Sequence, residues 1–176
     1  GLLTTLPEIL KTLNHGQIWV IFSQNNIINQ YGSAFVKALQ KSGYKIEIII
    51  LSDGEKSKSL SSMQGLISKL LQFGCDRSST FIAMGGGVVG DVTGFIAATF
   101  MRGVDYVQIP TTLLAMVDSA IGGKTSVNLP EGKNLMGVFW QPTAVAIDPQ
   151  FLQTLPKRDF SSAFGETIKY GAILDR

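Results

Sequence analysis

The chain has 176 residues, of which 45% are hydrophobic and 16% are charged, and its formal net charge is +2 at pH 7. This composition is typical of a domain with a hydrophobic core and excludes disordered, collagen-like and coiled-coil classes. The small net charge and the lack of any apolar run near the ~18 residues of a membrane helix argue against nucleic-acid and membrane partners. We therefore expect a compact domain whose partners are small molecules or protein.

Short apolar stretches alternate along the chain with stretches whose apolar residues have helical spacing. Strands are predicted, in chain order, at 17–22, 45–51, 80–84, 104–109 and 143–147. Helices are predicted at 27–41, 60–73, 88–99 and 159–174. The order is that of repeated strand–helix units, without an internal sequence repeat.

The predicted strands are apolar on both faces, which is typical of a parallel sheet covered by helices on both sides. The expected fold class is α/β, with a Rossmann-like, mostly parallel sheet whose ligands bind beyond the carboxyl ends of the strands. We assign residues 1–158 to this domain. The last predicted helix has no strand after it, so we expect 159–176 to begin a second, helical domain that the chain does not complete.

The stretch 122–137 has four glycines and two lysines, Lys124 and Lys133, and no clear strand or helix pattern. We expect a long loop here. Loops of this length inside a compact domain are usually functional or mobile.

The single cysteine, Cys75, cannot form an internal disulfide, which fits a reducing compartment. We interpret it as a small buried hydrophobic residue, because a thiol nucleophile would need a histidine partner and His15 is the one histidine of the sequence. The N-terminus lacks a signal pattern, so we expect a cytoplasmic protein. Since the first residue is Gly1 and not methionine, an upstream targeting segment stays open.

Three consecutive glycines, Gly85 to Gly87, follow a predicted strand and open a predicted helix. At such a place backbone N–H groups and the helix dipole can hold a pyrophosphate. The simpler interpretation is a tight connection that needs positive φ angles. The strand–helix context favours phosphate binding, although the spacing is not the usual G-x-G-x-x-G.

Further motifs follow in a fixed order: Asp53-Gly54-Glu55-Lys56-Ser57-Lys58, Gly86-Gly87-Val88-Val89-Gly90-Asp91, Ile109-Pro110-Thr111-Thr112, Gly122-Gly123-Lys124-Thr125, Gly132-Lys133-Asn134, Gln141-Pro142 and Gly165-Glu166-Thr167-Ile168-Lys169-Tyr170-Gly171. Together they resemble the 3-dehydroquinate synthase family, from about Ser52 to the end of the chain. The ordered combination is far more specific than any single motif.

The resemblance implies an NAD site. Its residues would be Asp53, Glu55 and Lys58 on the adenosine side, Gly86, Gly87, Val88, Gly90 and Asp91 around the pyrophosphate, and Thr111, Thr112, Lys133, Phe151 and Thr154 along the rest of the cofactor. Asp118, Lys124 and Asn134 would lie near the nicotinamide and the substrate. The residue types agree: acidic groups past a strand suit ribose hydroxyls, and lysines suit a carboxylate or phosphate. Taken alone, each lysine would be interpreted as a solvated surface charge.

Glu166 and Lys169 lie three residues apart on a predicted helix, where the simple interpretation is a surface ion pair worth little. By the resemblance, Glu166 would be a ligand of a divalent metal, zinc or cobalt, and Lys169 would contact the substrate. Catalytic zinc generally takes three protein ligands, and in the family two later histidines complete the site. These 176 residues do not contain those histidines.

Arg102 matches an arginine that, in the family, reaches the substrate phosphate in the partner subunit of a homodimer. The planar guanidinium suits two-point binding of phosphate oxygens. The alternative is an ordinary surface arginine at the start of a strand.

In the resembled family NAD oxidises a hydroxyl of the sugar acid phosphate DAHP, phosphate is eliminated, the ketone is reduced again, and ring opening with an aldol closure gives 3-dehydroquinate in the shikimate pathway. The metal would lower the pKa of the oxidised hydroxyl. The alternatives are another sugar phosphate cyclase or a related metal-dependent polyol dehydrogenase. For the chain alone we expect NAD binding without turnover.

Overall fold

The computed structural model describes residues 2–11 and 16–174, so His15 lies outside the described residues. Its centre is a five-stranded sheet in the order β2-β1-β3-β4-β7, and every neighbouring pair is parallel. Trp19 of the second strand in this order pairs with Ile46 on one side and Thr80 on the other. The strands are β1 (Ile18–Ser23), β2 (Lys45–Ile50), β3 (Thr80–Gly85), β4 (Asp105–Pro110) and β7 (Ala144–Val145). The predicted α/β class with a parallel sheet is confirmed, although β7 is shorter than the predicted strand.

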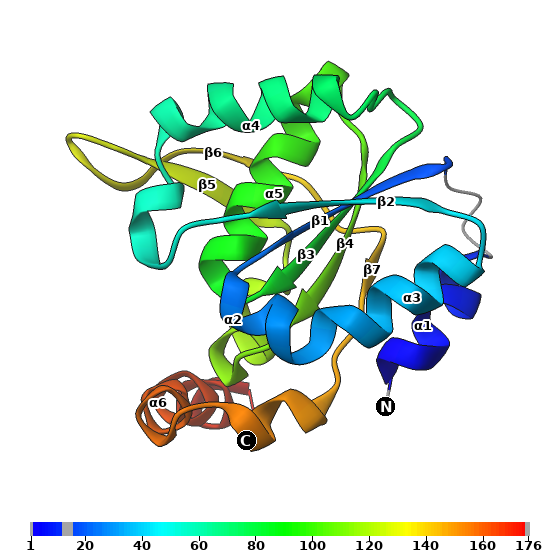
Figure 1. Cartoon of the computed structure of the whole chain (residues 1–176). Coiled ribbons are helices and arrows are strands. Elements are labelled where there is room, and N and C mark those ends of the chain that lie inside the picture. The colour runs from blue at the N-terminus through cyan, green and yellow to red at the C-terminus, as the bar shows by residue number, and fades with distance from the viewer. Residues whose placement is uncertain (1, 12–15, 175–176) are drawn as a thin grey trace.

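Both faces of the sheet are covered by helices (Figure 1). Successive side chains of a strand point to opposite faces, so Val20 and Phe22 pack on one face while Trp19 and Ile21 pack on the other. The first face is covered by α4 (Leu60–Gln72) and α5 (Gly87–Thr99), and the second by α1 (Leu2–Lys11) and α3 (Ser33–Lys41). Each fully buried large apolar side chain contributes about 1.5–3 kcal/mol, which favours apolar residues in the central strands β1, β3 and β4.

The predicted helix at 27–41 is present but is not one regular α-helix. It is built from α2 (Asn25–Ile27), a π-helical turn (Ile28–Gly32) and α3. The predicted helix at 60–73 is α4, whose first turn is capped by Ser59, with its Oγ accepting a hydrogen bond from the Ser62 N–H at 3.3 Å.

The expectation of a loop at 122–137 is wrong. The stretch forms an antiparallel hairpin of β5 (Lys124–Leu129) and β6 (Gly132–Phe139), with Thr125 opposite Val138. The hairpin packs on α5, and a Cβ on Gly94 of that helix would overlap the Cγ2 of Thr125. The close approach of helix and hairpin therefore depends on a glycine in the middle of α5.

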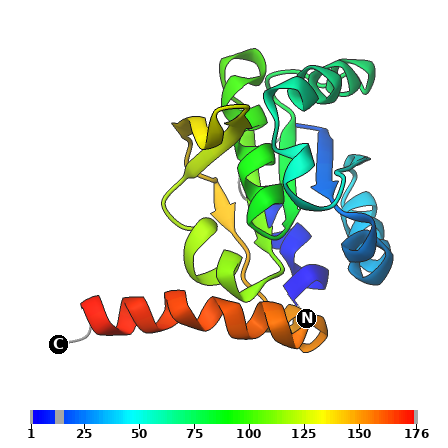
Figure 2. The same ribbon diagram turned by 90° about the vertical axis from the view of Figure 1, so that its left-hand side faces the viewer.

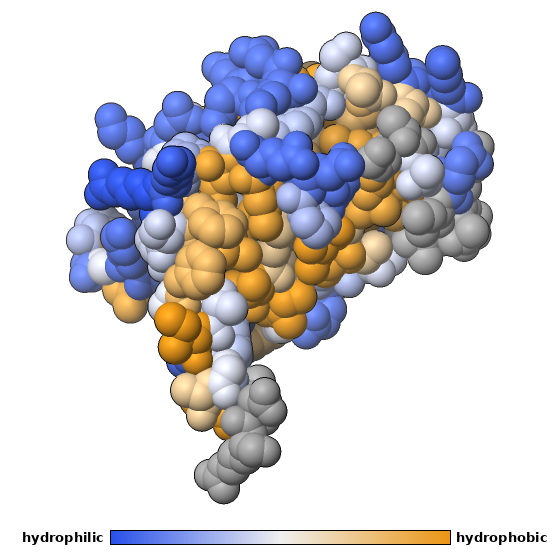
Figure 3. Space-filling model, turned by 90° about the horizontal axis from the view of Figure 1, so that it is seen from below, coloured by the Kyte–Doolittle hydropathy of each residue, from blue (hydrophilic) through white to orange (hydrophobic). Residues whose placement is uncertain are grey.

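The last helix, α6 (Lys157–Leu174), follows a short 3-10 segment (Pro149–Thr154) and lies below the sheet, with its far end projecting beyond the rest of the molecule (Figure 2). Its start lies near the predicted domain boundary at 158, but the division into two domains stays a prediction. Seen from below, apolar side chains gather in a broad patch (Figure 3). The large apolar side chains of α6 that are exposed are Phe164, Ile168 and Ile173. Within 2–11 and 16–174, none of the helices combines the length and apolarity required to cross a bilayer.

Candidate functional site

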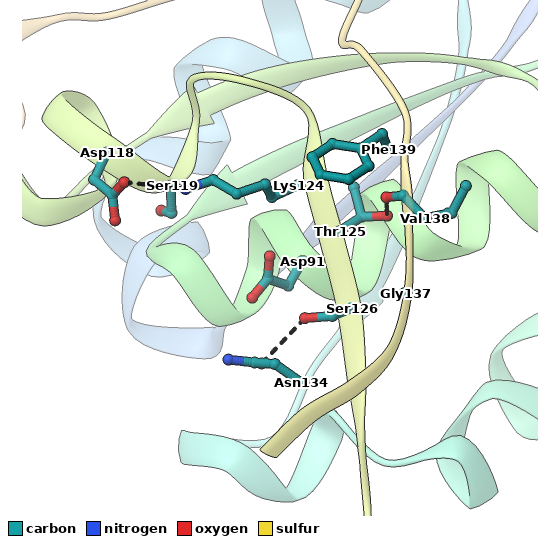
Figure 4. Close-up of a pocket in the computed structure, with 10 residues that line it drawn as sticks. All are labelled: Asp91, Asp118, Ser119, Lys124, Thr125, Ser126, Asn134, Gly137, Val138 and Phe139. Carbon is teal, nitrogen blue, oxygen red and sulfur yellow. Dashed lines mark hydrogen bonds and ion pairs between the residues drawn. The ribbon is translucent and has the colours of Figure 1, made fainter.

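A pocket of about 470 Å³ opens between the β5–β6 hairpin and the first turns of α5. Four residues that the sequence assigns to the site line it: Asp91, Asp118, Lys124 and Asn134 (Figure 4). The other lining residues are Ser119, Thr125, Ser126, Gly137, Val138 and Phe139. The structure thus brings together candidates from α5, from the π-helical turn η4 (Ala115–Ser119) and from both hairpin strands.

The glycine motif lies where β3 ends and α5 begins, next to this pocket. Gly86 has a φ of −81°, and none of Gly85, Gly86 and Gly87 has a positive φ, so the interpretation as a turn that requires positive φ is wrong. What the glycines provide is space. A Cβ at Gly85 would lie 2.5 Å from Cγ2 of Val89, and one at Gly90 would lie 2.8 Å from Oε1 of Gln108.

The start of α5 has the properties of an anion site. Gly86 occupies the N-cap position, and among the described residues no side chain caps the first turn of this 13-residue helix. Uncapped N–H groups at a helix start attract negative charge because the helix dipole is positive there. The predicted pyrophosphate residues Gly87, Val88 and Gly90 all belong to this helix.

Two threonines that follow β4 lie beside the glycine motif. The backbone N–H of Thr111 donates to the Gly85 carbonyl at 2.9 Å, and the Thr111 side chain is buried. Within the described part of the chain the Thr111 hydroxyl has no hydrogen-bond partner. The Thr112 methyl group faces Gly86, where an added Cβ would lie 3.2 Å away. A buried hydroxyl without a partner is costly, and a bound polar ligand would satisfy it.

Lys58 is 4% exposed, and its ammonium contacts the carboxylate of Asp91 and the side-chain oxygen of Asn134. Ser126 donates a second hydrogen bond to that oxygen at 3.0 Å. Burial raises the pKa of the Asp91 carboxyl, and the hydrogen bond and charge of Lys58 offset part of that rise. Lys58 therefore joins the 3-10 segment η2 (Gly54–Ser57) to α5 and to the hairpin.

One carboxylate oxygen of Asp118, Oδ1, is contacted by both an ammonium and a hydroxyl group. Lys124 Nζ lies 3.5 Å from Oδ1, and the Tyr170 hydroxyl donates to the same atom at 3.2 Å. Lys124 is largely exposed, so this ion pair adds little stability. Its ammonium remains accessible to an anionic ligand in the pocket.

The predicted adenosine-side acids lie outside this pocket, beyond the end of β2. Asp53 accepts a hydrogen bond from the Gln24 side chain at 3.0 Å. Glu55 accepts one from the Asn128 side chain at 2.7 Å and lies 3.8 Å from the ammonium of Lys133. Both carboxylates are exposed at the carboxyl-end edge of the sheet, where a ribose could reach them.

Three predicted residues lie away from the pocket. Phe151 is buried and packs edge-to-face on Tyr31 with ring centroids 4.8 Å apart, and the Thr154 hydroxyl contacts that of Tyr31. Arg102 is exposed, has a φ of +73° and follows the C-terminal end of α5, opposite the glycine motif. At that position it does not reach the pocket of its own chain.

Glu166 and Lys169 form an ion pair on α6. Within the described residues no cluster of three or more His, Cys, Asp or Glu side chains is present. Glu166 is thus a single candidate ligand, whereas a catalytic zinc generally takes three.

Several pocket residues were missed by the sequence reasoning, among them Ser119, Ser126 and Phe139, as was the link from Tyr170 to Asp118. The two inward residues of β5 are Thr125 and Val127, and because one of them is polar the sequence has no clear apolar alternation that marks this strand. Tyr170 and Asp118 are 52 residues apart, and no local pattern joins them.

A family model described as 3-dehydroquinate synthase N-terminal matches residues 48–162. This chain belongs to the 3-dehydroquinate synthase family. Relatives named 3-dehydroquinate synthase match the whole chain: one from Prochlorococcus marinus (strain MIT 9515) is 51% identical and one from Rippkaea orientalis is 49% identical. The alignments cover 49% and 48% of those proteins, so the chain spans about half the length of the curated relatives it matches.

Solved structures of related cyclases share the fold. A 2-deoxy-scyllo-inosose synthase complexed with carbaglucose-6-phosphate, NAD⁺ and Co²⁺ matches with a TM-score of 0.88 at 28% identity, over 97% of this chain and 47% of that one. A 2-epi-5-epi-valiolone synthase from Streptomyces hygroscopicus with NAD⁺ and Zn²⁺ bound matches with a TM-score of 0.79 at 31% identity, over 85% of this chain and 42% of that one. A glycerol dehydrogenase from Schizosaccharomyces pombe, at 19% identity and a TM-score of 0.77, shares the fold.

Proposed function

We propose that the chain is the NAD-binding part of a 3-dehydroquinate synthase, which converts DAHP to 3-dehydroquinate and phosphate. The observation that carries the proposal is the pocket in which Asp91, Asp118, Lys124 and Asn134 meet beside the start of α5. Family membership and the names of relatives at about 50% identity support it. A cytoplasmic homodimer in which Arg102 serves the partner's site is part of the same proposal.

NAD fits the residues that are present. The uncapped start of α5 would hold the pyrophosphate, the partnerless Thr111 hydroxyl would bond the cofactor, and Asp53 or Glu55 would accept hydrogen bonds from ribose. When bound, NAD supplies a hydride acceptor that can later return the hydride. Both related cyclases described above were solved with NAD⁺, which favours this cofactor.

The pocket's own residues suit an anionic substrate. The exposed ammonium of Lys124 would bind a carboxylate or phosphate, and the Asn134 side chain would orient a hydroxyl near it. The Asp118 carboxylate would accept a hydrogen bond or a proton from a substrate hydroxyl. Hairpin residues Val138 and Phe139 would limit the access of water to that region.

A divalent metal, zinc or cobalt, belongs to the proposal through Glu166 and the related structures solved with Co²⁺ or Zn²⁺. The described residues supply one candidate ligand, which does not make a three-ligand site.

The test is an assay on a protein of the relatives' full length that contains this chain. With DAHP and NAD⁺, phosphate and 3-dehydroquinate should appear in equal amounts without lasting NADH. Lys124→Met should raise the KM for DAHP about tenfold or more, because one favourable charge contact in a pocket is lost. Lys157→Met, an exposed lysine on α6, is the matched control and should not change KM. Lasting NADH accumulation would instead indicate a dehydrogenase.

A further inference from the structure

Among residues 2–11 and 16–174, one long-range side-chain hydrogen bond joins α6 to the pocket. The Tyr170 hydroxyl donates to Oδ1 of Asp118 at 3.2 Å, and Asp118 lies in η4, which α6 contacts. Tyr170 is partly buried although its neighbours on the helix, Ile168 and Lys169, are exposed. Its ring also lies under the ammonium of Lys169, with 4.8 Å from Nζ to the ring centroid.

These contacts form a continuous chain across the site. Glu166 pairs with Lys169, Lys169 lies over the ring of Tyr170, Tyr170 bonds Asp118, and Asp118 pairs with Lys124 of the hairpin. Asp118 Oδ1 therefore receives one donor from α6 and one from β5. The hydrogen bond from Tyr170 restricts the rotation of the Asp118 carboxylate and links α6 to η4, whereas the exposed pair with Lys124, at 3.5 Å, adds little to that link.

We propose that Tyr170 is a positioning residue: its hydroxyl fixes the Asp118 carboxylate and aligns α6, with Glu166 and Lys169, against the pocket. The catalytic part of this inference rests on the proposed function, since Asp118, Lys124, Glu166 and Lys169 are candidates for cofactor, substrate or metal contact. The alignment itself is a property of the fold and does not depend on which substrate is bound.

The first test is hydrogen exchange in Tyr170→Phe, measured by mass spectrometry on peptides of α6 in this chain. Phenylalanine keeps the ring and its contact with Lys169 but removes the donor. Amide exchange in α6 should become about tenfold faster, the equivalent of losing a hydrogen bond to a charged group. The control is Thr167→Val. Among the described residues the Thr167 hydroxyl donates within the helix, to the Ala163 carbonyl at 3.3 Å, and valine removes that hydroxyl. Exchange in this variant should stay at the wild-type rate.

The second test uses a protein of the relatives' full length that contains this chain, with DAHP as substrate. Tyr170→Phe should lower kcat about tenfold, because the hydroxyl holds the Asp118 carboxylate that the proposed function places near the nicotinamide and the substrate. With Asp118→Asn already present, Tyr170→Phe should lower kcat by less than twofold, since the two residues act as one unit.

The outcomes separate this inference from the proposed function. If the wild-type protein does not convert DAHP, the proposed function fails while the exchange experiment still tests the alignment. If Tyr170→Phe leaves α6 exchange unchanged, the alignment is refuted. If exchange rises but kcat is unchanged or the two substitutions act additively, Tyr170 is a structural contact and its positioning role is refuted.

Discussion

The buried ammonium of Lys58 contacts the carboxylate of Asp91, although 33 residues separate the two in the sequence. The pair connects the segment after β2 to the first turns of α5, and Asn134 of the hairpin joins it through its side-chain oxygen. Removing one member of a buried pair leaves the other charge without compensation, which is more costly than replacing both. The pocket wall at Asp91 is therefore held by a contact within the protein, the pair with Lys58, and not by a bound ligand.

Lys58→Met should destabilise the chain by about 3 kcal/mol, because the Asp91 carboxylate would remain buried without its cation. Urea unfolding at neutral pH measures this loss. Lys69→Met, on the exposed side of α4, is the matched control and should change stability by less than about 0.5 kcal/mol. An effect of Lys58→Met as small as that of the control would show that the buried Asp91 carboxylate does not depend on the Lys58 ammonium.

The same variant should change the pH dependence of stability. Burial already raises the pKa of Asp91, and Lys58 lowers it, so the variant should raise that pKa further. A folded-state pKa above the unfolded value means that the folded protein binds the proton more tightly, so stability falls as pH rises through the folded pKa. Lys58→Met should therefore lose more stability between acidic and neutral pH than the wild type. Carbon NMR titration of the Asp91 carboxyl measures the pKa directly, and an unchanged or lower pKa would contradict the prediction.

Gly94→Ala should destabilise the chain by about 1–3 kcal/mol, the usual range for overpacking. The added methyl group would overlap the Cγ2 of Thr125 and would lie 3.2 Å from Cζ of Tyr106. Thr125→Ser removes that Cγ2 and keeps the hydroxyl that bonds the Val138 carbonyl at 2.8 Å. The double variant should therefore recover part of the loss in thermal unfolding. If Thr125→Ser does not reduce the cost of Gly94→Ala, the hairpin is not packed on α5 in this register.

The central strands β1, β3 and β4 could be predicted to within a few residues because they are buried almost throughout and mostly apolar, and β2, at the edge, still has four isoleucines among its six residues. The hairpin could not be predicted. One of the two buried residues of β5 is the polar Thr125, and half of the residues of β6 are glycine, lysine or asparagine. The helix α1 had a signal in Leu2, Leu6 and Leu10, spaced by four, although Pro7 argues against a helix interior.

The sequence predicted which residues belong to the candidate site, but it did not predict which of them contact one another. The glycine motif and the pocket residues Asp91, Asp118, Lys124 and Asn134 came from ordered motifs, and the fold places those four in one pocket. The contacts of these residues could not be predicted from the motifs. Lys58 with Asp91 and Tyr170 with Asp118 are contacts between elements whose relative position is set by the sheet. Sequence spacing carries no information about such distances.

Glu55→Gln should weaken NAD⁺ binding about tenfold while leaving stability within about 0.5 kcal/mol of the wild type. The carboxylate is exposed and its ion pair with Lys133 is long, at 3.8 Å, so its loss has little structural cost. Glutamine keeps an oxygen for the Asn128 side chain but is a weaker acceptor for ribose hydroxyls. Calorimetric titration of the wild-type chain and of Glu55→Gln with NAD⁺ measures the effect. Equal affinities of wild type and Glu55→Gln would remove Glu55 from the cofactor site.

The thiol of Cys75 should react with a disulfide reagent at least about a hundredfold more slowly in the folded chain than in urea. Cys75 is buried in the core between the sheet and α4, and burial raises its pKa above the ordinary value of 9.0, with Ser79 offsetting part of the shift. The thiolate is the nucleophile, so both lack of access and lack of ionisation slow the reaction. Because the sequence has one cysteine, the absorbance of the released thiol reports this site alone. Rapid modification of the folded chain at pH 8 would show an accessible thiolate and would reopen the interpretation of Cys75 as a reactive residue.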